Sequence, residues 1–142
     1  MVEVIVGVMD RNSDPKLVSD LREQTSNAIF GTSRLHVDQQ RSIRSIIGEA
    51  ITNAYEHTVG EGEVSCSVTD LKGGISVMIS NPSEGFCGGI SGYPEDPFAM
   101  SGRGCQFIKD LIDGLWPDLQ AFCGWRFDSN ERRTIFWLLL CY

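Results

Sequence analysis

The chain has 142 residues, of which 42% are hydrophobic, which suits one domain over residues 1–142 and leaves little room for a second. Its formal net charge of −7 disfavours nonspecific binding to nucleic acid or to an anionic membrane, because an acidic surface gains nothing from counterion release. No apolar run is long enough to span a bilayer, and the first residues lack the pattern of a secretory signal.

The cysteines are scattered, with no Cys-x-x-Cys pair and no Cys/His cluster: Cys66, Cys87, Cys105, Cys123 and Cys141. This spacing argues against a structural zinc site and against a disulfide framework. We therefore expect a reducing compartment, the cytoplasm. The acidic net charge, in turn, favours a protein partner over nucleic acid or membrane.

The first part of the chain predicts one strand and two helices. Val2 to Met9 is rich in β-branched residues and predicts a strand. Asp14 to Phe30 predicts a helix that begins with Asp at the cap and Pro at the first helical position. A second helix opens at Val37 or Asp38 and ends near Gly60.

A change of period predicts a β-hairpin after the second helix. From Glu63 the apolar residues recur every second position, first over Val64–Val68 and again over Ile75–Ile79. The connection Asp70–Gly74 ends in two glycines and has a common hairpin length. Two half-buried strands are therefore expected here.

The last part of the chain predicts a long loop, a helix and two strands. Asn81 to Ser101 is rich in glycine and proline and has no sustained period, and long loops in compact domains are usually functional. A helix with one apolar face begins at Gly104, and strands follow over Leu119–Phe127 and Thr134–Cys141. This order of elements predicts an α+β two-layer sandwich, with helices on one face of a mixed, mostly antiparallel sheet.

The second helix carries the most informative pattern, because Glu49, Asn53 and His57 are spaced four residues apart along the border of an apolar arc. A carboxylate and a carboxamide at i and i+4 point the same way, where polar groups can meet a ligand. The pattern is typical of a metal-nucleotide site. The alternative is a core helix with a polar flank and an incidental Glu/Asn pair.

A second motif, Ser101-Gly102-Arg103-Gly104, stands immediately before the last predicted helix. Glycine backbone can approach a ligand closely, and the free N–H groups of a helix start suit a phosphate. Arg103 would add a phosphate contact or be solvated. The alternative is a tight turn without a ligand.

Together these motifs resemble the ATP-binding domain shared by histidine kinases, DNA gyrase and heat-shock chaperones. Within that superfamily, the chain looks most similar to the small anti-sigma-factor serine/threonine kinases of bacteria. Their phrases Glu-Ala-x-x-Asn-Ala-x-x-His and Gly-Arg-Gly-x-x-x-Ile match Glu49–His57 and Gly102–Ile108. The resemblance spans most of the chain.

The resemblance implies roles for the helix residues. Asn53 would be the ligand of the Mg²⁺ that bridges the phosphates of ATP, and Mg²⁺ needs few protein ligands because it keeps several waters. Glu49 would be the general base, one turn away. His57, the last of the three, would have a structural role, either in the core or through a hydrogen bond. Alternatively, it would contact the nucleotide.

The resemblance also implies an adenine-binding box over residues 81–85, and here the chain departs from the family. Asn81 replaces the aspartate that accepts the adenine amino hydrogen, although an Asn oxygen can accept that bond as well. Ser83 replaces the first glycine of the box, whereas Gly85 keeps its register. Residues 84–100 would form a lid over the nucleotide.

The function implied is an ATP-dependent serine/threonine kinase that phosphorylates an anti-anti-sigma-like protein in a partner-switching system, with a sigma factor as a further partner. The alternative, motivated by Asn81 and Ser83, is a regulatory module of the same fold that acts by protein contact. The first strand could also be a sheet edge through which a homodimer pairs, or plain core.

Overall fold

The computed structural model describes residues 2–10, 15–32, 35–58, 63–84 and 100–142. Within them the elements follow in the order β1 (Val2–Asp10), α1 (Pro15–Thr32), α2 (Val37–Glu56), β2 (Glu63–Leu71), β3 (Gly74–Pro82), α3 (Met100–Leu115), β4 (Gln120–Asp128) and β5 (Arg133–Cys141). None of the helices in these ranges combines the length and the apolar character needed to cross a membrane.

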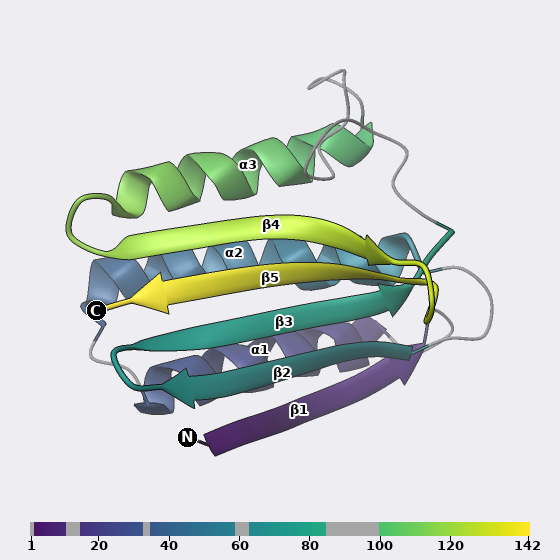
Figure 1. Ribbon diagram of the computed structural model, residues 1–142, viewed down its shortest axis with the longest axis horizontal. Helices are drawn as coiled ribbons and strands as arrows, with labels where there is room; N and C mark the ends of the chain where they lie inside the picture. Colours follow the sequence, from purple (N-terminus) through teal and green to yellow (C-terminus); the bar gives the residue numbers. More distant parts are fainter. Residues whose placement is uncertain (1, 11–14, 33–34, 59–62, 85–99) are drawn as a thin grey trace.

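The strands form a five-stranded sheet in the order β1-β2-β3-β5-β4, and each of the four pairings is antiparallel. β5 is inserted between β3 and β4, so these two strands run parallel to each other and α3 connects them. The three helices cover one face of the sheet (Figure 1). The predicted two-layer α+β sandwich is confirmed, with a sheet more uniformly antiparallel than expected.

The core lies between the sheet and the helices, as the two periods predict. Every second residue of the inner strands faces the helices and is buried, and α2 contributes a row of isoleucines: Val64, Cys66, Val68, Ile75, Val77, Ile79, Phe136, Leu138, Leu140, Ile43, Ile46, Ile47 and Ile51. Each large aliphatic side chain buried in this way contributes about 1.5–3 kcal/mol. This packing fixes α2 across the sheet.

The β2–β3 hairpin has a shorter connection than expected, the two residues Lys72 and Gly73, because Leu71 already pairs with Gly74. Gly73 has a φ of 87°, in the left-handed region that glycine adopts without strain. A side chain at Gly74 would collide with the carbonyl oxygen of Leu140 on β5. Both glycines are therefore required by the turn and by the close approach of β5.

Three helix ends differ from the sequence prediction. α1 continues through Gly31 to Thr32, and α2 ends at Glu56, a turn earlier than expected. α3 begins at Met100 and not at Gly104, so it includes two glycines near its start. Burial of the apolar face at Ile108, Ile112 and Leu115 offsets the roughly 1 kcal/mol that each helical glycine costs.

Candidate functional site

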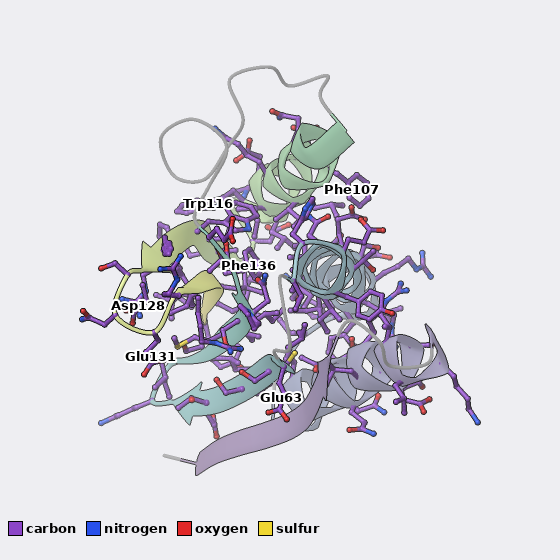
Figure 2. All side chains as sticks on the ribbon, turned by 90° about the vertical axis from the view of Figure 1, so that its right-hand side faces the viewer. Glu63, Phe107, Trp116, Asp128, Glu131 and Phe136 are labelled. Carbon is purple, nitrogen blue, oxygen red and sulfur yellow. The ribbon has the colours of Figure 1, made fainter. Side chains whose placement is uncertain are left out.

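Four segments far apart in the sequence meet at one end of the molecule. They are the C-terminal part of α2, the end of β3, the start of α3 and the β4–β5 turn, and Figure 1 shows all four at the right-hand side. Figure 2 looks directly at this end, where Asp128 and Glu131 mark the turn and Glu63 marks the start of β2. The end therefore gathers most of the predicted site.

Helix α2 presents Glu49 and Asn53 at the border of its buried face. Both side chains are partly exposed, whereas Ala50 and Ile51 between them are buried. Gly48 is buried beside Arg22 of α1, whose guanidinium would lie 2.9 Å from a Cβ at this position. The structure thus places the carboxylate and the carboxamide on one edge of the helix, as the spacing predicts.

His57 lies at the C-terminal cap of α2 and is exposed, so the expectation of a buried core role for its side chain is wrong. Its backbone N–H donates to Asn53 O at 3.0 Å. At this end of the helix the buried Thr58 hydroxyl donates to Ala54 O at 2.6 Å and so satisfies a carbonyl of the last turn. Nucleotide contact by the imidazole stays a prediction.

The end of β3 holds Asn81 and Ser83 in the sheet. Only 4% of Asn81 and 8% of Ser83 are exposed. The Asn81 side-chain amide donates to Pro82 O at 3.1 Å, which uses one of its two amide hydrogens. The backbone N–H of Ser83 donates to Arg132 O at 3.0 Å. Asn81 is thus the next-to-last residue of β3, paired with Thr134 of β5, and not the first residue of the predicted loop.

Thr134 joins the candidate site through its position in the sheet, which the sequence did not reveal. It pairs directly with Asn81 across the β3–β5 ladder, so the two side chains share the helix-facing side of the sheet. The hydroxyl of Thr134 can donate or accept beside the carboxamide of Asn81. Only the strand order could have identified it, because 52 residues separate the pair in the sequence.

The glycine motif lies within α3 and not before it, which corrects the predicted position of Gly102, Arg103 and Gly104. Because the helix begins at Met100, the motif falls in its first turns, and the first four backbone N–H groups of a helix have no partner within it. Phosphate binding at Gly102 and Arg103 is therefore still expected, but at the start of a helix and not in a loop. Gly85 and most of the predicted lid lie outside the described residues.

The donor set suits a nucleotide with its metal better than a metal alone. Among the described residues, no three His, Cys, Asp or Glu side chains are grouped as metal ligands. The partly exposed carboxamide of Asn53 can supply one oxygen to Mg²⁺, which takes further oxygens from phosphate and water. The buried carboxamide of Asn81 suits the edge of a base.

The fold is that of histidine-kinase catalytic domains. The catalytic domain of the histidine kinase ThkA, in a nucleotide-free form, is similar with a TM-score of 0.55 and 16% identity, over 72% of this chain and 66% of that chain. The mycobacterial sensor histidine kinase MprB has a TM-score of 0.55 and 10% identity, over 99% of this chain and 97% of that chain. No family model and no curated protein matches the sequence.

Proposed function

We propose that this protein binds Mg-ATP and transfers its γ-phosphate to a serine or threonine hydroxyl of a small regulatory protein. The observation that carries the proposal is the gathering of α2, the end of β3 and the start of α3 at one end of a histidine-kinase-like fold. Those segments carry the partly exposed Glu49 and Asn53 and the buried Asn81.

The proposed roles follow from the side-chain chemistry. Asn53 holds Mg²⁺, which when bound neutralises charge on the phosphates. Glu49 accepts the proton of the attacking hydroxyl while the hydroxyl oxygen bonds to the γ-phosphorus. The bond from that phosphorus to the bridging oxygen breaks, and ADP leaves with the electron pair. The first-turn N–H groups of α3 suit the phosphates.

The resemblance to anti-sigma-factor kinases supports a more specific role. In that role the substrate is an anti-anti-sigma-like protein, and a sigma factor competes with it for the same kinase. Phosphorylation of the antagonist releases it and frees the kinase for the sigma factor. The net charge of −7 is consistent with protein partners and disfavours nucleic acid.

A second candidate is a regulatory module that acts by protein contact and binds nucleotide weakly or not at all. The contacts of the adenine box favour it, because the Asn81 amide is satisfied by Pro82 and the Ser83 N–H by Arg132. If the donors of the adenine box already have partners, fewer of them can form hydrogen bonds with an adenine base. Nucleotide binding separates the two candidates.

The test is calorimetric titration of the purified chain with ATP, with and without Mg²⁺. We expect binding that requires Mg²⁺ and that Asn53→Ala weakens about tenfold or more. Asn27→Ala, an exposed helical position on α1, is the matched control and should leave the affinity unchanged. Absence of binding at millimolar ATP would withdraw the kinase and favour the protein-contact module.

A further inference from the structure

Arg133 ties three strands together on the sheet face opposite the helices, directly behind Asn81. It is the first residue of β5 and pairs with Pro82 of β3 and with Asp128 of β4. Strand alternation places Arg133 and Ser80 on the open face and Asn81 on the helix-facing side. The arginine therefore reaches the strand that carries Asn81 from the opposite face.

The guanidinium makes an extended set of hydrogen bonds, which we call the Arg133 clasp. Its Nε donates to Ser80 Oγ at 3.2 Å, and its Nη2 lies 3.1 Å from both Ser80 Oγ and Ser80 O. Nη2 also donates to Glu63 O at the start of β2. Ser80 Oγ lies 2.8 Å from Ser65 Oγ, which extends the clasp along β2. Such charge-assisted bonds are stronger than neutral ones.

The turn before Arg133 holds the other side of the adenine box. Arg132 has a φ of 54°, a left-handed backbone conformation, and its carbonyl oxygen accepts the Ser83 N–H at 3.0 Å. The turn is itself braced by Asp128, whose Oδ1 accepts the N–H groups of Asn130 at 2.9 Å and Glu131 at 3.2 Å. Contacts from Arg133 and from the turn thus flank Asn81, at residues 80 and 83 respectively.

We propose that Arg133 is a positioning residue for base recognition, which rests on the proposed nucleotide function. By fixing Ser80 and the strand ends on either side, the clasp holds the backbone from which Asn81 projects toward the ligand. Thr134 follows Arg133 directly, so the same contacts also position the residue opposite Asn81. Because a bond to a base depends steeply on donor–acceptor geometry, loosening this strand end weakens recognition of adenine without removing a contact to it.

The experiment compares Arg133→Ala with Arg126→Ala. Arg126 is exposed on the same sheet face, on the edge strand β4 opposite Ile135, and takes no part in the clasp. Calorimetry measures the affinity for Mg-ATP and for Mg-tripolyphosphate, which has no base. We expect Arg133→Ala to weaken ATP about tenfold while tripolyphosphate changes less than about twofold. Arg126→Ala should change neither.

Two milder variants keep the test informative if Arg133→Ala folds poorly. Arg133→Lys retains one cationic donor, and Ser80→Ala removes the hydroxyl that receives two of the bonds. Both should weaken ATP by a smaller factor, about threefold, again without a matching loss for tripolyphosphate. Equal losses for the two ligands would mean a purely structural role and would overturn the inference.

Amide hydrogen exchange of the free protein supplies a readout that needs no nucleotide. Protection of the Ser83 N–H should fall at least about tenfold in Arg133→Ala and stay unchanged in Arg126→Ala. If the wild-type chain binds neither ATP nor tripolyphosphate, the proposed function fails and the positioning role falls with it. If it binds ATP and the two arginine variants behave alike, only the positioning role fails.

Discussion

Helix α2 and the end of β3 meet at the same end of the molecule, but they hold their polar residues differently. Glu49 and Asn53 stand on the edge of a regular helix and are partly exposed to solvent. Asn81 is 4% exposed, lies inside a strand, and is flanked by contacts from the β4–β5 turn and from Arg133 at the start of β5. The polar residues of α2 are therefore partly open to solvent, whereas Asn81 is buried within the sheet.

The difference fits the two roles proposed for these regions. A metal ligand and a general base must exchange water and protons, so partial exposure suits them. Recognition of a base edge depends on hydrogen-bond donors and acceptors that are held in place and shielded from water. The rigid, buried end of a strand suits this requirement. The comparison therefore predicts that substitutions in α2 change catalysis or metal binding, while those at β3 change base selection.

The largest effect should come from Glu49→Gln, which removes the proposed general base and keeps the shape of the side chain. We expect phosphotransfer to fall about 10²- to 10⁴-fold, while the affinity for Mg-ATP changes less than about threefold. Phosphoserine formation on a small partner protein, followed by intact-mass spectrometry, measures the first quantity, and calorimetry measures the second.

The matched control is Glu23→Gln, the same substitution at an exposed position on α1. It should leave both phosphotransfer and ATP affinity unchanged. Full phosphotransfer by Glu49→Gln would remove Glu49 from the mechanism and leave α2 with a metal site only.

A smaller effect is expected from Asn81→Asp at the buried end of β3. The substitution replaces the amide that donates to Pro82 O with a carboxylate oxygen, so two oxygens would face each other in a buried position. We expect ATP affinity to fall about tenfold, and ATP to lose preference over GTP, as measured by calorimetry. Asn27→Asp adds the same charge on exposed α1 and should change neither. Tighter ATP binding by Asn81→Asp would instead point to an eroded adenine pocket.

The sequence predicted the two regions unequally, for physical reasons. The row on α2 follows from helical geometry, so the positions of Glu49 and Asn53 on one edge could be inferred from spacing alone. The surroundings of Asn81 depend on β5, which follows β3 by about 50 residues and inserts beside it. Neither Thr134 nor the Arg133 clasp could be inferred without that strand order.

Local signals also misled the prediction where tertiary packing dominates. Gly102 and Gly104 resemble a helix boundary, yet α3 continues through them because its later turns are buried against α2 and the sheet. His57 follows the apolar arc in helical projection, but the helix ends before it, so its side chain is exposed. Hydrophobic period thus predicted which elements form more reliably than where they end.

The smallest expected effect tests whether water is excluded from the protein interior next to Asn81. Cys66 on β2 pairs with Ile79 of β3, two residues before Asn81, and is 1% exposed. Burial raises the pKa of the Cys66 thiol from 9.0 to about 12. Above about pH 9 the unfolded chain releases this proton while the native chain keeps it, so native stability falls as pH rises toward 12.

The free energy of unfolding should therefore be compared between the wild type and Cys66→Ala by urea titration at pH 8 and pH 10. The stability advantage of the wild type should shrink by about 1 kcal/mol over this interval, because only the wild type carries the buried thiol. Cys141→Ala, at a half-buried position at the end of β5, measures the background from substituting another thiol. An advantage independent of pH would mean that water reaches Cys66, and the rigid dry support assumed for Asn81 would have to be abandoned.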